Sequence, residues 1–191
     1  MSHGWKTGVV VSCAALSLAA RGPTQIDAIK VSCAQFRELG QNVQKRVLSF
    51  LQGYVKRDVS EDKVGSVMVG GGLSRVLDAC VHAPDEPVVA KVEEVAAGPD
   101  TGARGEARLT RPPTAMTCRD YVKLGRADQR LTVYWLDGYS RKNDPTDANQ
   151  SVVALDRDPE DMAKKACSKR EQRLWWAIQG SARSVAPAPA S

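Results

Sequence analysis

Apolar residues recur at steps of three and four over two stretches of the chain, which is the pattern of a helix with one buried face. The first stretch predicts a short helix, a turn at Gly40, and a longer helix over about 42–56. The second stretch repeats the pattern and ends in a polar turn over 142–147. The apolar positions are, in order, Phe36, Leu39, Val43, Val47, Phe50, Leu51 and Tyr54, then Tyr121, Leu124, Leu131, Trp135, Leu136 and Tyr139.

Two more helices are expected after each long one. One begins near Gly72 and runs to Cys80, and its counterpart before Cys167 has Asp158 as its cap and Pro159 at its first position. The last helices are expected over about 85–95 and 168–179. Residues 64–69 are the only candidate for a short extended piece. The pattern therefore predicts an all-α fold of two small units with about four helices each.

The two stretches are copies of one unit, because they align without a gap over the first half. When Cys33 is placed over Cys118, Gly40 falls on Gly125 and Gln44 on Gln129. Phe50-Leu51 then falls on Trp135-Leu136, Gly53-Tyr54 on Gly138-Tyr139 and, after a two-residue length difference, Cys80 on Cys167. We expect a first repeat over 27–95 and a second over 117–180. The Gly-, Pro- and Ala-rich segment 96–116 is expected to be a flexible linker, and 181–191 a disordered tail.

The N-terminus is typical of an export signal over 1–20. Lys6 precedes an apolar and small stretch over 8–20, and Ser17-Leu18-Ala19 has small residues where signal peptidase cleaves. The stretch is too short for a membrane anchor, so no stable membrane insertion is expected after the signal is removed near Ala19. The alternative interpretation is a buried N-terminal helix. We favour the signal, and we expect Cys13 to be lost with it.

Four cysteines then remain, two in each repeat, and they allow three pairings. Duplication favours pairing within each repeat, since each unit must once have been stable alone. The predicted disulfides are therefore Cys33–Cys80 and Cys118–Cys167. Each closes a loop of nearly fifty residues, which in the chain-entropy model contributes on the order of 4 kcal/mol. A unit this small needs such help because its core alone is marginal.

Composition and side-chain chemistry exclude most other function classes. The apolar fraction of 42% is enough for a core, and the net charge of +5 is spread without a basic run, so nucleic-acid binding is not expected. His3 and His82 are the only histidines, and no CxxC occurs, which argues against metal sites, serine or cysteine triads and thiol exchange. The run Gly70-Gly71-Gly72 lacks the Lys-Ser/Thr of a phosphate loop. We therefore expect no enzyme activity, no cofactor and no metal.

Each repeat resembles the HdeA/HdeB family of periplasmic acid-stress chaperones. The resemblance rests on the cysteine spacing, on the aromatic residues three positions after each first cysteine, and on the Gly-Tyr pair in each long helix. The matching residues are Cys33, Phe36, Gln44, Phe50, Leu51, Gly53, Tyr54 and Cys80, and Cys118, Tyr121, Gln129, Trp135, Leu136, Gly138, Tyr139 and Cys167.

The resemblance implies a periplasmic, ATP-independent holdase that is dimeric near neutral pH, opens in strong acid and binds unfolded proteins. Acid would protonate carboxylates, leave the Lys and Arg charge unopposed, and loosen the apolar helix faces while the disulfides limit unfolding. The expected client-binding residues are Phe50, Leu51, Tyr54, Trp135, Leu136 and Tyr139. The same residues also fit the simpler interpretation that they are core, and both hold if acid uncovers the core.

Two departures from the family pattern leave alternatives open. Family members are typically single units, so this tandem could form an intramolecular pseudo-dimer or a homodimer. The chain is also basic, since +5 becomes about +4 when Lys6 leaves, which puts the acid trigger in question. The alternatives are a periplasmic inhibitor or immunity protein with one specific protein target, and an envelope-associated module whose linker arginines Arg104, Arg108 and Arg111 contact anionic polymer.

Overall fold

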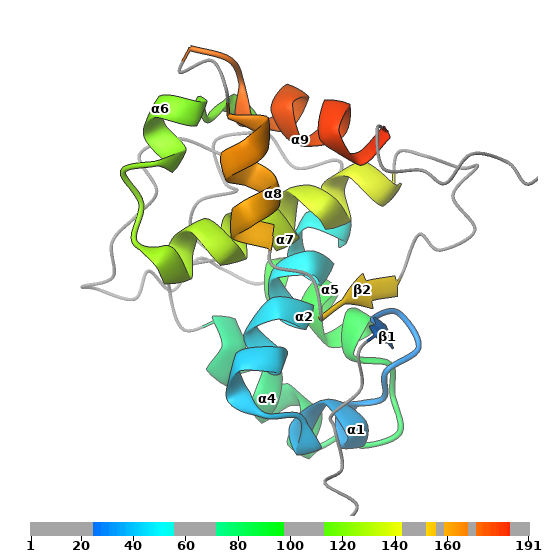
Figure 1. Cartoon of the computed structure of the whole chain (residues 1–191). Coiled ribbons are helices and arrows are strands. Elements are labelled where there is room, and N and C mark those ends of the chain that lie inside the picture. Colours follow the sequence, from blue (N-terminus) through cyan, green and yellow to red (C-terminus); the bar gives the residue numbers. More distant parts are fainter. Residues whose placement is uncertain are drawn as a thin grey trace, which may run out of the picture.

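The computed structural model describes residues 25–55, 72–97, 113–142, 152–155, 159–167 and 171–183. Over these residues the chain is helical apart from two short strands (Figure 1). The expected export signal, the candidate extended piece 64–69, the cap Asp158 and the end of the tail lie outside the described residues.

The first repeat contains one strand and four described helices. They are β1 (Gln25–Asp27), α1 (Cys33–Glu38), α2 (Gln41–Val55), α4 (Gly72–Val81) and α5 (Val88–Ala97). Helices α2 and α4 lie within a residue of the predicted bounds. Helix α5 begins later than predicted because Pro87 first pairs with Ser32 in a β-bridge.

The second repeat has its described α-helices in the same order, but a 3-10 helix precedes them and its strand follows the long helix. Its elements are the 3-10 helix η3 (Pro113–Ala115), α6 (Cys118–Tyr121), α7 (Arg126–Lys142), β2 (Val152–Ala154), α8 (Pro159–Ala166) and α9 (Leu174–Arg183). Helix α9 also begins later than predicted, since Arg173 pairs with Thr117 as Pro87 does with Ser32. Helix α5 reaches Ala97 and η3 begins at Pro113, inside the range 96–116 expected for the linker, and residues 98–112 of that range lie outside the described residues. The all-α prediction of two helical units is confirmed.

The short first helix of each repeat begins at a capping box. The Ser32 hydroxyl accepts the Gln35 N–H, and the Gln35 side chain accepts the Ser32 N–H. Thr117 and Asp120 make the equivalent pair before α6, where the Thr117 hydroxyl also donates to the Asp120 carboxylate at 2.8 Å. Each box satisfies N–H groups that a helix start leaves without a partner.

A small antiparallel sheet joins the repeats. Strand β1 of the first repeat pairs with β2 of the second, with Ile26 opposite Val153. Both residues are buried, at 7% and 0% exposed. The sequence did not predict these strands, because three residues are too few to show an alternating pattern. The sheet places part of the second repeat directly on the first.

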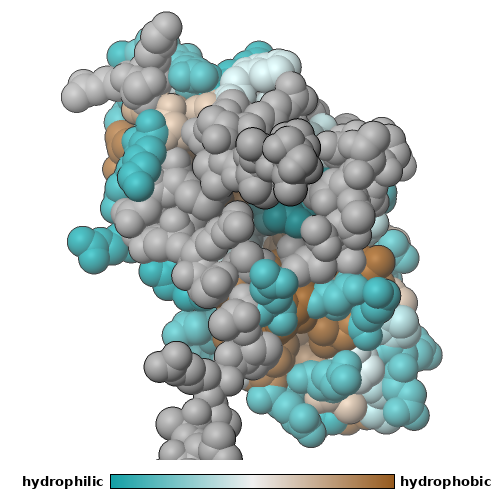
Figure 2. Space-filling model, turned by 45° about the vertical axis from the view of Figure 1, so that its right-hand side comes forward, coloured by the Kyte–Doolittle hydropathy of each residue, from teal (hydrophilic) through white to brown (hydrophobic). Residues whose placement is uncertain are grey.

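Two apolar cores flank the central helices α2 and α7, which make the most extensive helix contact in the described chain (Figure 1). The first core contains Phe36, Phe50 and Leu51 of the first repeat, and also Tyr134 and Val153 of the second. The buried residues of the second core all come from the second repeat. Figure 2 shows apolar atoms between hydrophilic ones in the lower part of the molecule. Several apolar side chains are only partly buried against the first core, among them Ile29, Val31 and Val89.

Candidate functional site

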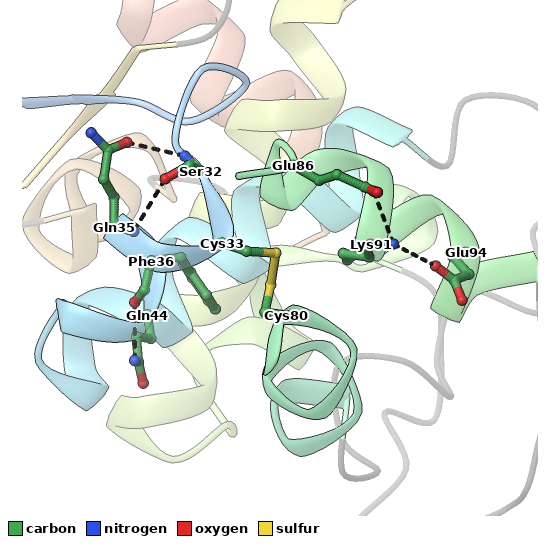
Figure 3. The surroundings of a disulfide bond; sticks show 9 residues. All are labelled: Ser32, Cys33, Gln35, Phe36, Gln44, Cys80, Glu86, Lys91 and Glu94. Atoms are coloured by element: carbon green, nitrogen blue, oxygen red, sulfur yellow. Dashed lines mark hydrogen bonds and ion pairs between the residues drawn. A yellow bond between two sulfur atoms is a disulfide. The ribbon is translucent and has the colours of Figure 1, made fainter. Parts of the chain in front are cut away.

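One disulfide closes each repeat, as the duplication predicted. Cys33 bonds to Cys80 and ties the start of α1 to the end of α4 (Figure 3). Cys118 bonds to Cys167 and ties α6 to the residue after α8. Each first cysteine also donates its backbone N–H to the loop before the last helix, from Cys33 to the Glu86 carbonyl and from Cys118 to that of Gln172.

The matching glutamines of the two repeats connect the short helix to the long one. Gln44 Nε2 donates to the Phe36 carbonyl oxygen at 3.1 Å, and Gln129 Nε2 donates to that of Tyr121 at 3.1 Å. Both amides are buried, so they satisfy carbonyls at the end of a helix where water has little access. These residues hold the turn before each long helix, a structural role that their spacing alone did not reveal.

Helices α2 and α7 cross at two glycines that occupy equivalent places in the repeats. A Cβ on Gly53 would overlap the backbone carbonyl of Trp135, and a Cβ on Gly138 would overlap that of Phe50. The two contacts are related by an approximate twofold axis between the repeats. Glycine is required at both positions because the helix backbones touch there.

The six predicted client-binding residues lie in or beside this crossing, on α2 and α7. Phe50, Leu51 and Leu136 are 0% exposed and Trp135 is 1% exposed, whereas Tyr54 and Tyr139 are partly buried. Rings stack along each helix, with centroids 6.2 Å apart for Phe50 and Tyr54 and 5.3 Å apart for Trp135 and Tyr139. At neutral pH these side chains are therefore core, and a client could reach them only after the protein opens.

Polar contacts across the crossing differ on the two sides of the approximate axis. On one side the Ser49 hydroxyl donates to the Leu131 carbonyl at 2.7 Å. On the other, the Arg46 guanidinium lies 5.8 Å from the centroid of the Tyr134 ring, and its Nη1 donates to the Leu155 carbonyl at 3.1 Å. Burial raises the pKa of the Tyr134 hydroxyl, an effect that the Arg46 charge opposes.

Carboxylates hold the outer elements that cover each core. Lys91 of α5 contacts Glu86 at 2.9 Å and Glu94 at 3.2 Å, and these partners, Glu86 first, raise the pKa of Lys91 (Figure 3). In the second repeat Arg119 of α6 pairs with Glu171, which lies just before α9. These ion pairs lie within one repeat, as do those of Lys30 with Asp27 and of Arg141 with Asp137.

Helices α5 and α9 are equivalent lids over the two cores. Val88 and Val92 of α5 are buried in the first core, as Leu174 and Ile178 of α9 are in the second. Helix α5 packs on α2, and the Trp175 ring of α9 lies edge-on to that of Tyr139, with centroids 5.2 Å apart. Displacing α5 would uncover part of α2, whereas α9 packs mainly on α8 and η3 and contacts α7 through the Trp175 ring.

Sequence reasoning missed Arg46 and Tyr134, which connect the repeats. They are positions where the repeat alignment fails, since Arg46 falls on Leu131 and Tyr134 falls on Ser49. The sequence signal for these two residues lies in the aligned positions at which the repeats differ, not in those that they share. The same comparison also shows Thr132 in place of Val47 and Trp135 in place of Phe50.

Within the described residues, no group of three or more His, Cys, Asp or Glu side chains is arranged to hold a metal ion. None of the described helices is both long enough and apolar enough to cross a membrane.

Neither a curated protein nor a solved structure matches the chain. The sequence model of the HdeA/HdeB family matches it twice, over residues 6–90 and 95–175. The two matches cover most of the sequence, and each contains a repeat unit with its own disulfide. The chain therefore belongs to the HdeA/HdeB family, of which it carries two tandem copies.

Proposed function

We propose that this protein is a periplasmic, ATP-independent chaperone that binds unfolded proteins in acid. The observation that carries the proposal is its place in the HdeA/HdeB family, a family of periplasmic acid-stress chaperones. The structure supports it in one further respect. The apolar faces that would bind a client are buried at neutral pH, and carboxylate contacts fasten the helices that cover them.

Acid weakens the ion pairs that hold these covering helices. Acid in general neutralises carboxylates and leaves lysine and arginine side chains charged. It therefore removes the attraction in the ion pairs of Lys91 and Arg119. Each pair alone contributes little, because solvent screens exposed ion pairs. Their joint loss leaves a basic chain with growing internal repulsion, which favours opening of the lids α5 and α9.

The disulfides set the limit of that opening. Cys33–Cys80 and Cys118–Cys167 keep each first helix attached to the chain segment before its lid. The opened state is then expanded but still helical, with apolar surface available to a client. The client-binding surface comprises the faces of α2 and α7 that carry Phe50, Leu51, Tyr54, Trp135, Leu136 and Tyr139.

The experiment measures whether the disulfide-intact protein keeps an acid-denatured client soluble between pH 7 and pH 2. Protection should appear in acid and be absent at neutral pH. The variant Glu86→Gln with Glu94→Gln mimics protonation and should begin to protect at a higher pH. Glu93→Gln on the same helix is the matched control, because Glu93 is exposed and is not one of the carboxylates bonded to Lys91, and it should behave as wild type. A protein that protects nothing at any pH would contradict the proposal and favour a binder of one specific target.

A further inference from the structure

The crossing of α2 and α7 is symmetric at its centre and asymmetric one turn away. Gly53 and Gly138 make the same contact in opposite directions, as the twofold axis requires. Towards the start of each helix the equivalent positions carry different residues. Ser49 corresponds to Tyr134, and Arg46 corresponds to Leu131. The twofold-related contacts are therefore Ser49 with Leu131 on one side and Tyr134 with Arg46 on the other.

These two contacts are chemically complementary only when a first repeat faces a second repeat. Tyr134 is 4% exposed and belongs to the core of the first repeat, whereas the equivalent Ser49 adds no bulk to the second core. Arg46 places its positive charge against the Tyr134 ring and donates to Leu155, which follows β2 of the second repeat. Arg46 is partly buried, and among the described residues its Nε atom is buried without a hydrogen-bond partner. The Tyr134 side chain compensates the guanidinium charge through its ring and through its hydroxyl, whose pKa Arg46 lowers by charge and by a side-chain hydrogen bond.

Two identical repeats could not reproduce this arrangement. A pair of first repeats would set Ser49 against Arg46 twice and leave both guanidinium groups without a ring. A pair of second repeats would set Tyr134 against Leu131 twice and supply no cation. The β1–β2 pairing also favours contact between a first and a second repeat. It holds β2 beside the first repeat, and Leu155, whose carbonyl accepts from Arg46, directly follows β2.

We propose that the face of α2 is a docking surface specific for α7 of the second repeat, with Arg46 and Tyr134 as the residues that determine this specificity. The partner of each repeat is the other repeat of the same chain. A second copy of the protein is not accepted at this face, because the tethered repeat already fills it at a high effective concentration.

The test uses the full chain with a protease site introduced between Ala97 and Pro113. The folded, disulfide-intact protein is cut there, and its halves are weighed by native mass spectrometry and light scattering at micromolar concentration. The expected particle contains one first repeat and one second repeat. Particles with two copies of the same half, or halves that separate, would overturn the proposal.

Variants then test the two named residues. Tyr134→Leu keeps apolar bulk but removes the ring, and it should weaken association of the cut halves about tenfold, the factor typical of a desolvated cation–π contact. Tyr134→Phe keeps the ring and loses only the hydroxyl contact with Arg46, so it should weaken association less than Tyr134→Leu. Arg46→Leu should weaken association as Tyr134→Leu does, whereas Arg37→Leu, the same change at an exposed position of α1, should have no effect. Equal association in all four variants would show that specificity lies elsewhere.

A double-mutant cycle keeps the proposal falsifiable if one cut variant fails to fold. The unfolding equilibrium constant of the uncut chain is measured for Arg46→Leu, Tyr134→Leu and both together. The double variant should be about fivefold more stable than the two single effects predict, because the second change removes a contact already lost. Simple additivity would overturn the assignment of Arg46 and Tyr134 as a pair.

Discussion

Gly53 and Gly138 show how single residues fix the approach of the two repeats. In an ordinary helix interior, alanine is favoured over glycine by about 1 kcal/mol. Here the added Cβ would meet the backbone carbonyl of Trp135 or Phe50, and a backbone atom cannot move aside as a flexible side chain can. The helices would have to separate, and the contacts along both would weaken.

We predict that Gly138→Ala destabilises the protein by about 1–3 kcal/mol, since overpacking outweighs the gain in helix propensity. Gly53→Ala should have a similar effect, and urea unfolding of the disulfide-intact protein measures both. Gly40→Ala is the control, because a Cβ there meets nothing within 4 Å and only a helix-cap preference of at most about 1 kcal/mol is lost. A stabilised Gly138→Ala variant would show that the close crossing does not exist in solution.

The Tyr134 hydroxyl makes the free energy of unfolding depend on pH in the alkaline range. Burial is the main cause that raises the pKa of its hydroxyl above the ordinary value of 10.0. Above pH 10 the unfolded chain ionises this phenol while the folded chain keeps it neutral, so the free energy of unfolding falls as the pH rises. Below pH 10 the hydroxyl is neutral in both states and has no such effect.

Tyr134→Phe should therefore flatten the decline in stability between pH 9 and pH 11, as followed by thermal unfolding. Equal slopes for wild type and Tyr134→Phe would mean that the hydroxyl is open to water.

The helices α2 and α7 correspond in sequence but bury different chemistry. Val47 and Phe50 of α2 are apolar, whereas the equivalent Thr132 and Trp135 of α7 bring a hydroxyl and an indole N–H. Thr132 is 0% exposed and Trp135 is 1% exposed, and within the described residues neither polar atom has a hydrogen-bond partner. A buried polar group without a partner costs about 1–3 kcal/mol, so the second repeat should be the less stable one.

Exchanging the residues at one equivalent position tests this difference. Thr132→Val should stabilise the protein by about 1 kcal/mol, because it removes the unpaired hydroxyl at nearly constant volume. Val47→Thr, the reverse change in the first repeat, should destabilise it by about 1–3 kcal/mol. Urea unfolding reports both, and a destabilised Thr132→Val variant would show that the hydroxyl is hydrogen-bonded.

At the same scale, periodicity predicted the long helices well and the last helices less well. Helix α2 follows its apolar steps almost to the residue, because its buried residues extend from Gln44 to Gly53. Helices α5 and α9 start late because Pro87 and Arg173 first pair with Ser32 and Thr117. That pairing depends on contacts between residues distant in sequence, which a local pattern does not contain.

Over the whole molecule, duplication predicted the disulfides but not how the repeats meet. Rare shared residues, the cysteines above all, reveal the common unit. The contact between repeats depends instead on Arg46 and Tyr134, where the copies differ, and on the strands β1 and β2, which are too short to detect. The candidate residues were identified by their apolar face, which also fitted a core role, but the crossing of α2 and α7 that buries them could not be predicted.

Acid activation requires that the packing that keeps the protein closed near neutral pH is lost in acid. The contacts between the repeats described above are strand pairing, hydrogen bonds from Arg46 and Ser49 to backbone carbonyls, and a cation–π contact, and none of them involves a carboxylate. The carboxylate ion pairs and caps lie within the repeats, and several fasten the lids. Opening should therefore begin with α5 and α9 rather than with separation of the repeats.

The most direct test is a titration of the disulfide-intact protein from pH 7 to pH 2, followed by an apolar-surface dye and by tryptophan emission. We predict little dye binding at neutral pH. Near pH 4, where carboxylates are protonated, dye binding should rise and the tryptophan emission should shift to the red together. Far-ultraviolet circular dichroism should retain most of its helical signal throughout. A protein that binds no dye and keeps its neutral emission down to pH 2 would contradict the claim that acid uncovers the apolar faces of α2 and α7.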